Sequence, residues 1–315
     1  MGVALWGLIF VCVSSAEGQT TAPRPSLFAR RSVSTSRTNV GYIDTAYVGS
    51  MVGLRTEMAY GNDFPDRAEF FYAKCGCFRN FGDPKAPGPP LPESSVDFQT
   101  VQADIQLALS ERMAAFVELP FRFINPEQND NSAGVGDVQA GIKFALWNDE
   151  EMTITFQLRA YAPTGAAERG LGTAHPSLEP ALLLYERLTD RWTLEAELRD
   201  WIAIDGSSGL GTHSPTQPFS GNILRYGVGL SYLVHETESA RISPVAEFVG
   251  WSVLEGQESN TIDVSDAAGR TIVNAKLGLR IAGDGWGSLY AGYGRALTNS
   301  VWYEDIIRVE YRMMF

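Results

Sequence analysis

The chain has 315 residues, of which 44% are hydrophobic and 20% are charged, a composition that excludes a disordered or collagen-like chain. The 37 acidic residues outnumber the 25 basic ones and give a net charge of −12, which argues against nucleic-acid binding because phosphates demand a basic surface. A helical membrane protein is excluded too, since no run approaches the ~18 consecutive apolar residues that a spanning helix needs.

The first 16 residues have the pattern of a secretory signal peptide. An apolar run extends from Val3 to Val13, and Ser14 and Ala16 supply the small residues that precede a cleavage site. No basic residue precedes the run, and a buried N-terminal strand is the alternative interpretation. We predict export and cleavage after Ala16.

Residues 17–47 are predicted to form a mobile periplasmic leader. From Glu17 to Asn39 the chain is rich in Ser, Thr and Pro, and after Glu17 this stretch contains arginines but no acid. Such a composition offers little apolar surface to bury. A role in plugging or tethering another part of the molecule is the other possibility.

Cys75 and Cys77 are the two cysteines that remain after cleavage, and one residue separates them. A disulfide between them would close a strained ring, because only one residue separates the two cysteines. Bonded cysteines normally have Cα atoms about 4.4–6.8 Å apart. Zinc would require four ligands, and no histidine has finger-like spacing with this pair. We expect a local disulfide clip or a pair of thiols in an exported loop, and neither a metal nor a cofactor.

From residue 48 onward the sequence alternates between apolar and polar residues. In the stretch from Met152 to Ala162, Phe156 falls on an apolar face and Thr155 and Arg159 fall on a polar one. Successive side chains of a strand point to opposite sides, so this pattern predicts a strand long enough to cross a bilayer at a tilt. The same alternation recurs in residues 48–60, 101–109, 115–123, 138–146, 178–188, 192–198, 223–235, 241–254, 273–281, 287–297 and 307–315.

Three features favour a membrane barrel over an exported β-sandwich, which would also alternate. The strands are longer than the five or six residues usual in soluble proteins. Their connections alternate between tight turns and long loops, as in outer-membrane barrels. Tryptophans also gather near strand ends, as in aromatic girdles, although strict alternation would turn three of the six inward. These six are Trp147, Trp192, Trp201, Trp251, Trp286 and Trp302.

We therefore predict an all-β fold, an antiparallel up-and-down transmembrane β-barrel of about twelve strands over residues 48–315. Only a closed sheet lets strands pair every backbone group inside a bilayer. Such a protein lies in the bacterial outer membrane, and we expect the barrel insertion machinery to recognise its C-terminal strand, which ends at Phe315. The segment from Arg67 to Phe78 could be a further strand, but it would make thirteen, so we place it in the first long loop.

Several motifs resemble an outer-membrane family named for the meta-pathway of phenol degradation. They are Gly136 to Lys143 (GDVQAGIK), Tyr161 to Gly165 (YAPTG) and the closing strand from Tyr311 to Phe315. The stretch from Arg67 to Cys77 (RAEFFYAKCGC) is similar to a variant in planctomycete-type bacteria. The resemblance covers residues 48–315 and implies a small barrel in a family whose members are described as transporters. It does not imply that phenol is the solute.

If the apolar faces contact lipid, the polar faces must line the lumen. Charges there must be hydrated or paired, because an isolated buried charge is very costly. Their mixed signs predict no strong preference for anions or cations. The predicted lumen-lining residues are Asp104, Glu118, Arg122, Lys143, Arg159, Glu195, Glu197, Arg199, Arg225, Glu247, Lys276, Arg280, Arg308, Glu310 and Arg312.

The function predicted from these features is an outer-membrane channel or transporter for small solutes, among which small aromatic or hydrophobic compounds are candidates. The alternative is a closed structural or adhesive surface barrel stitched shut by ion pairs. Strand number does not decide, since twelve lies between filled eight-stranded barrels and open sixteen-stranded porins. A barrel hydrolase is the least expected class, because His213–Ser214 is the only adjacent His/Ser pair and no Gly-x-Ser-x-Gly elbow is present.

Overall fold

The computed structural model describes residues 38–63, 65, 72–80, 82–204, 219–259, 264–298 and 302–315. The predicted signal peptide, residues 17–37 of the predicted leader and the His213–Ser214 pair lie outside these ranges. Within them, no helix is long and apolar enough to cross a membrane.

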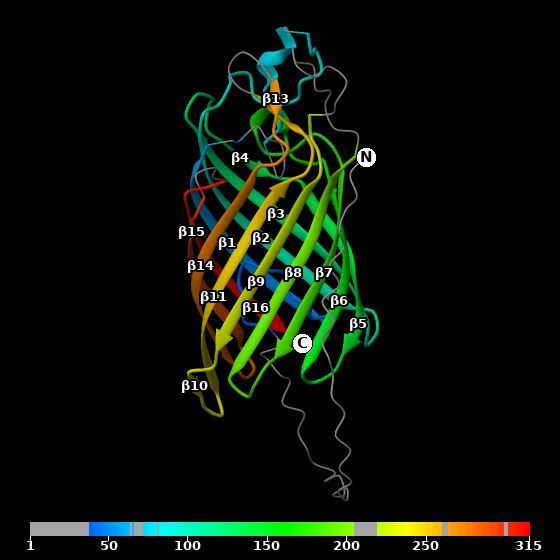
Figure 1. Cartoon of the computed structure of the whole chain (residues 1–315), viewed down its shortest axis with the longest axis vertical. Coiled ribbons are helices and arrows are strands. Elements are labelled where there is room, and N and C mark those ends of the chain that lie inside the picture. The colour runs from blue at the N-terminus through cyan, green and yellow to red at the C-terminus, as the bar shows by residue number, and fades with distance from the viewer. Residues whose placement is uncertain are drawn as a thin grey trace, which may run out of the picture. The chain divides into compact units, whose positions relative to one another are not determined.

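Twelve long strands form one closed antiparallel barrel, with the long loops at the top of Figure 1 and the tight turns at the bottom. The strands are β1 (Met51–Asn62), β2 (Val96–Ala108), β3 (Met113–Pro126), β5 (Val138–Asn148), β6 (Met152–Ala162), β7 (Ser177–Arg187), β8 (Trp192–Ala203), β9 (Ile223–Tyr232), β11 (Ala240–Val253), β14 (Thr271–Gly283), β15 (Gly287–Ala296) and β16 (Asp305–Met314). Each pairs with the next along the chain, and β16 pairs with β1, which closes the ring. The predicted strand number and topology are confirmed.

Short elements extend the connections between these strands. They are β4 (Ser132–Val135), β10 (His235–Glu236), β12 (Gln257–Ser259), β13 (Val264–Asp266) and the 3₁₀ helices η1 (Gly76–Asn80) and η2 (Ala167–Arg169). In the segment considered as a thirteenth strand, residues 67–71 lie outside the described ranges, and the described part from Tyr72 onward leads into η1 without forming a strand.

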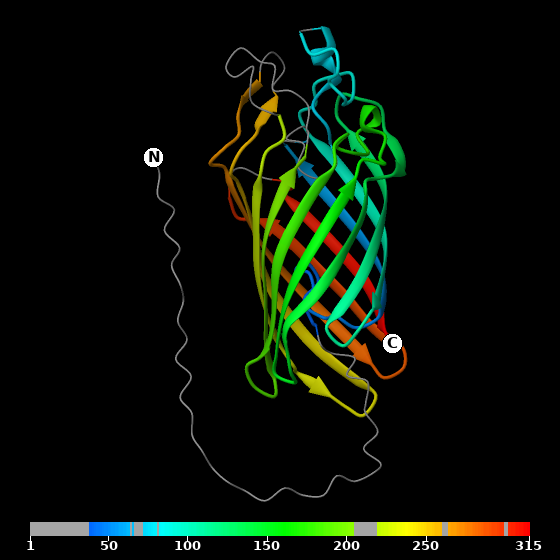
Figure 2. The ribbon, with the colours of Figure 1, turned by 90° about the vertical axis from the view of Figure 1, so that its right-hand side faces the viewer.

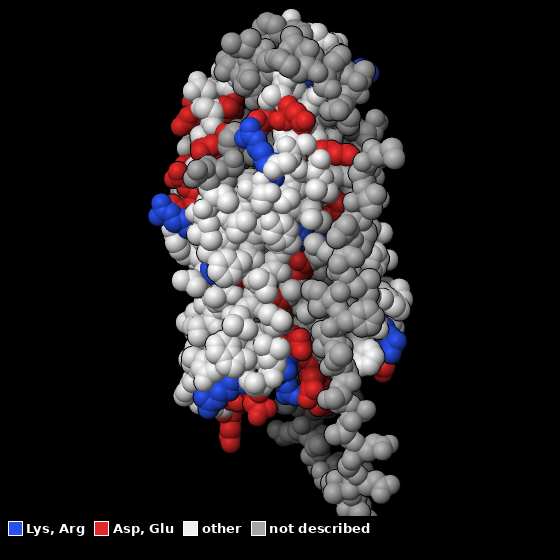
Figure 3. Space-filling view, in the orientation of Figure 1, with Lys and Arg blue, Asp and Glu red and all other residues white. Residues whose placement is uncertain are grey.

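The distribution of side chains is the reverse of that in a water-soluble protein. The apolar Ile105, Val117 and Leu277 are 54%, 50% and 68% exposed, whereas Gln157 and Glu179 are fully buried in the interior. Hydrocarbon solvates apolar surface but not charge, so this arrangement fits a barrel that is embedded in lipid. On the face shown in Figure 3, a broad uncharged band separates two rims where Lys, Arg, Asp and Glu gather.

A β-bulge explains why one tryptophan departs from strict alternation. The register of β5 against β6 shifts between Ala145 and Trp147, so that Trp147 turns outward and is exposed. Trp201 and Trp251 follow the alternation and are buried inside the barrel. The exposed tryptophans at the tight-turn end are therefore Trp147, Trp192 and Trp286.

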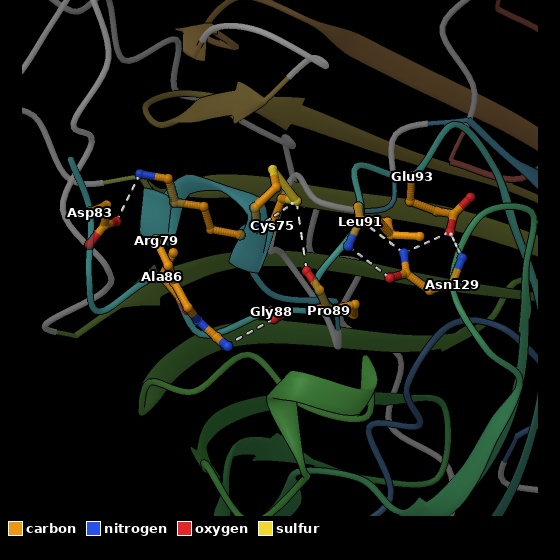
Figure 4. Close-up of a disulfide and its surroundings, with 11 residues drawn as sticks. Cys75, Arg79, Asp83, Ala86, Gly88, Pro89, Leu91, Glu93 and Asn129 are labelled. Atoms are coloured by element: carbon orange, nitrogen blue, oxygen red, sulfur yellow. Dashed lines mark hydrogen bonds and ion pairs between the residues drawn. A yellow bond between two sulfur atoms is a disulfide. The ribbon is translucent and has the colours of Figure 1, made fainter. Parts of the chain in front are cut away.

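The first long loop contains a disulfide between Cys75 and Cys77, whose Cα atoms are 5.2 Å apart (Figure 4). The Arg79 guanidinium donates hydrogen bonds to nearby backbone carbonyls of the same loop. Farther along, the Glu93 carboxylate accepts hydrogen bonds from the backbone and side chain of Asn129 in the next long loop. The hydrogen bonds between Glu93 and Asn129 join two of the long loops to each other.

The lipid-facing surface can be tested at Phe156, which lies near the middle of β6 and points outward. Phe156→Arg should lower the free energy of unfolding by about 2–4 kcal/mol, the cost of a cation near the bilayer midplane. Phe156→Leu is the matched control, and urea titrations in lipid vesicles measure both. Equal losses for the two variants would contradict the assignment of this face to lipid.

Candidate functional site

Residues 38–47, which precede β1, run through the interior of the barrel, and we call them the luminal segment. The blue trace ahead of β1 lies inside the barrel in Figure 2. Val40, Ile43 and Ala46 are each about 1% exposed. The predicted mobile leader includes these ten residues, whereas the structure places them across the lumen, with bends at residues 41–43.

Three glutamates of the wall bind the backbone N–H groups of this segment. Glu195 on β8 accepts hydrogen bonds from the amides of residues 39 and 40, at 2.7 and 3.2 Å. Glu247 on β11 accepts from the amides of residues 41, 42 and 43, at 3.0, 2.9 and 3.0 Å. Glu197 on β8 accepts from the amide of residue 44 at 2.8 Å. Six consecutive N–H groups are thus held by carboxylate oxygens.

Basic side chains of other strands bind the carbonyl groups of the same segment. Arg280 on β14 donates to the carbonyl oxygens of residues 39 and 40, at 2.8 and 2.7 Å. Arg308 on β16 donates to the carbonyl oxygen of residue 41, and Lys143 on β5 donates to that of residue 45 at 2.8 Å. Buried backbone groups must be paired, and here charged side chains of the wall supply partners that secondary structure would normally provide.

Close packing fixes the position of the segment at Gly41. A Cβ atom at this residue would lie 2.2 Å from the ring of Tyr290, a distance that no side chain tolerates. Tyr290 is fully buried, and its hydroxyl donates to the same Glu247 that holds the segment. Glycine is therefore required where the segment passes this wall.

Asp44 is the one charged side chain of the luminal segment. Its carboxylate accepts a hydrogen bond from Arg159 on β6 at 2.6 Å and lies 2.9 Å from a guanidinium nitrogen of Arg199 on β8. Glu179 on β7 contacts both of these arginines, at 2.9 and 3.2 Å, and also Arg225 at 2.7 Å. A buried charge is tolerated only when it is paired, and this network satisfies the rule.

The fifteen residues predicted to line the lumen lie on nine different strands, and the structure brings most of them to the luminal segment or to its Asp44. Twelve are buried, and Asp104, Glu118 and Arg225 are half-buried. Three further charged residues of the interior were not predicted: Arg55, Glu57 and Glu179.

Glu179 shows why these three were missed. Its strand has apolar residues on both faces, because Ala181 and Leu183 point inward and pack against Ala46 of the luminal segment. The strict alternation from Leu178 onward would nevertheless have placed Glu179 in the interior.

On the side of the long loops, a cavity of about 150 Å³ lies against the luminal segment. Its lining includes the aromatic rings of Tyr42, Trp251 and Tyr303 and the cations Lys276 and Arg308. The smaller cavity beside Thr45 and Lys143 measures about 30 Å³.

Two motifs that carried the family resemblance meet at the outer mouth. The Asp137 carboxylate accepts hydrogen bonds from the amides of Gly165 and Thr173, at 2.9 and 2.8 Å. Thr164 donates to the carbonyl oxygen of Gly136 at 2.9 Å. These bonds fold the loop between β6 and β7 over the end of the barrel.

Residues 96–301 match the family described as "Putative MetA-pathway of phenol degradation". The chain belongs to this family. No curated protein matches the sequence.

Solved structures that are similar to this chain include an outer membrane channel, an autotransporter domain and a porin. The COG4313 outer membrane channel from Pseudomonas putida F1 is 14% identical, with a TM-score of 0.55 over 88% of this chain and 100% of that chain. The β domain of the Bordetella autotransporter BrkA is 13% identical, with a TM-score of 0.48 over 85% of this chain and 100% of that one. The KdgM porin is 10% identical, with a TM-score of 0.44 over 84% and 99%. The closed twelve-stranded ring, its exposed apolar side chains and the first of these similarities show that this family member has the fold of an outer-membrane β-barrel.

A substitution of Glu247 tests whether this carboxylate retains the luminal segment inside the barrel. Glu247→Gln replaces an accepting oxygen and removes the charge from four hydrogen bonds, three from amides of the segment and one from Tyr290. Each is worth about 1.5–3 kcal/mol when the acceptor is charged. We expect chymotrypsin to cleave the segment at Tyr42 or Tyr47 roughly tenfold faster or more, since each ~1.4 kcal/mol changes a population tenfold. The mass of the digested barrel reports the cleavage.

Glu238→Gln, in an exposed turn, is the matched control and should leave cleavage unchanged. If both variants resist chymotrypsin as the wild type does, Glu247 does not retain the segment.

Proposed function

We propose that this protein is a non-enzymatic outer-membrane channel for small solutes and that its lumen is closed at rest by its own luminal segment. The observation that carries the proposal is the hydrogen bonding of six consecutive backbone amides to wall carboxylates. If this segment left, the same carboxylates and their basic counterparts would face water, as the charges of a porin do.

The way the segment is attached supports its release as a unit. The barrel is closed by strand pairing between β1 and β16 and between β9 and β11, and none of these ladders includes residues 38–47. Withdrawal therefore breaks hydrogen bonds to side chains but leaves the sheet intact. The segment stays connected to β1 through residues 48–50, so it can return to the same place.

A closed structural or adhesive surface barrel is the second candidate, and one observation favours it. Glu179 is fully buried and forms ion pairs with three arginines. Such a buried network makes a core rigid, and here it would keep the lumen closed. In that case the luminal segment would be a fixed part of the core.

We propose that residues 1–16 are a signal peptide that is cleaved on export. We also propose that the insertion machinery recognises β16, where Tyr311 and Met313 are exposed, together with the exposed Phe315 that follows it. The aromatic rings beside the 150 Å³ cavity support small aromatic or hydrophobic compounds as solutes.

Deleting residues 38–47 should open the channel. In planar bilayers we expect the deletion variant to show discrete conductance steps several-fold larger or more frequent than those of the full chain. Gly41→Val is a second variant that keeps the chain length, because its side chain would collide with Tyr290 and prevent seating of the segment. Folded deletion and Gly41→Val barrels that remain silent would favour the structural scaffold.

A reversible lock provides the complementary experiment. Ala46 packs against Ala181 of β7, so Ala46→Cys combined with Ala181→Cys should join the segment to the wall under oxidising conditions. We expect conductance to fall on oxidation and to recover on reduction. The Ala46→Cys single variant controls for reduction of the native Cys75–Cys77 disulfide. Equal conductance of the oxidised and reduced double variant would show that the segment does not control the pore.

A further inference from the structure

Cations outnumber carboxylates among the side chains that line the 150 Å³ cavity. Seven of them are Arg or Lys, whereas three are Asp or Glu. Arg159, Arg199 and Arg225 are compensated by Glu179 and Glu197, which lie behind the lining. Glu195 and Glu247 instead bind amides of the luminal segment, and no ion pair of the described residues includes Lys276.

Lys276 is a buried cation of this cavity that is held by a hydroxyl group and aromatic rings. Its side chain is buried, and its ammonium group donates to the hydroxyl of Tyr303 at 2.7 Å. The ammonium lies 3.8 Å from the ring centre of Tyr42 and 5.5 Å from that of Trp251. Among the described residues, no carboxylate forms an ion pair with it. Aromatic faces attract a cation but do not replace a counter-ion in a desolvated site.

The unsatisfied polar atoms of the cavity lining are all donors. The indole N–H of Trp251 and the Nε–H groups of Arg308, Arg159, Arg199 and Arg55 are buried without a hydrogen-bond partner in the described part of the chain. No acceptor of the described lining is left in this condition. Buried polar groups are normally paired, so the cavity is complementary to a ligand that supplies acceptors and negative charge.

Size and shape restrict this ligand further. A cavity of ~150 Å³ is about the size that holds one benzene ring. The rings of Trp251 and Trp302 stack with their centres 6.1 Å apart, and Tyr303 stands edge-on to Trp251 at 6.2 Å. Aromatic ligands are favoured against such a surface.

We propose that this cavity binds a small aromatic carboxylate, a single ring with one carboxylate group, whose oxygens accept hydrogen bonds from Lys276, Arg308 and the indole of Trp251. The ring lies against Trp251 and Trp302, and Tyr42 of the luminal segment forms the floor. This proposal names a solute class for the proposed channel and rests on that function for transport, although binding itself requires no conduction.

Calorimetric titration of the full-length protein in detergent tests the site with benzoate and with benzyl alcohol, which has the same ring without the charge. We expect benzoate to bind at least tenfold more tightly. Benzyl alcohol binding equally well, or no heat from either compound, would overturn the proposal.

Two variants separate the charge from the ring. Lys276→Met should weaken benzoate at least tenfold and leave benzyl alcohol nearly unchanged, and Trp251→Phe should weaken benzoate several-fold by removing one N–H donor. Lys85→Met, at an exposed lysine of the first long loop, is the matched control. Full benzoate affinity in Lys276→Met would exclude this site.

The outcome is independent of the conductance experiments. Benzoate binding that depends on Lys276, in a protein that never conducts, would retain the site and refute the channel. Conduction after release of the segment, without selective benzoate binding, would retain the channel and refute the site.

Discussion

The interior of this barrel depends on one constraint: a backbone amide that leaves water must find a hydrogen-bond partner. A strand of the wall meets the requirement through its neighbours in the sheet. The luminal segment has no such neighbour, and Glu195, Glu197 and Glu247 meet the requirement for its N–H groups, while Arg280, Arg308 and Lys143 meet it for carbonyl groups. Acidic groups of the wall thus bind the N–H groups of this segment, and basic groups bind its carbonyl groups.

This sorting connects the fold to the proposed function. Because the contacts are made by side chains, the sheet is complete whether or not the segment is present. Each charged group that binds the segment would otherwise be exposed to water in an open lumen, which is a tolerable state for a charge. The interior can therefore exist in two arrangements, a closed one with paired charges and an open one with hydrated charges. In the closed arrangement the buried Lys276 forms no ion pair with a carboxylate of the described residues and binds the hydroxyl of Tyr303 instead.

Most of the wall could be predicted from the sequence because a strand imposes a period of two. The segment from Met152 to Ala162 shows this most clearly, since β6 has these bounds and Phe156 and Thr155 lie on opposite faces. The inward direction of Trp201 and Trp251 also follows from alternation. The outward direction of Trp147 does not, because a bulge inserts one extra residue and no local pattern marks it.

The luminal segment could not be predicted in the same way. Its partners in the wall lie 59 to 274 residues away in the chain, and no periodic pattern records contacts between such distant residues. One signal was present: Val40, Tyr42 and Ile43 give the end of the predicted leader more apolar surface than a mobile chain needs. Arg55, Glu57 and Glu179 could have been found by extending the alternation into strands where both faces contain apolar residues.

Hydrogen–deuterium exchange of the wild-type protein in lipid nanodiscs tests the central claim most directly. The amides of residues 39–44 are bound to carboxylates, so they should exchange as slowly as amides of β8 and β11 and far more slowly than those of a free peptide with the same sequence. Exchange of these six amides at the rate of the free peptide would contradict the account, because the segment would then lie in water and not in the lumen.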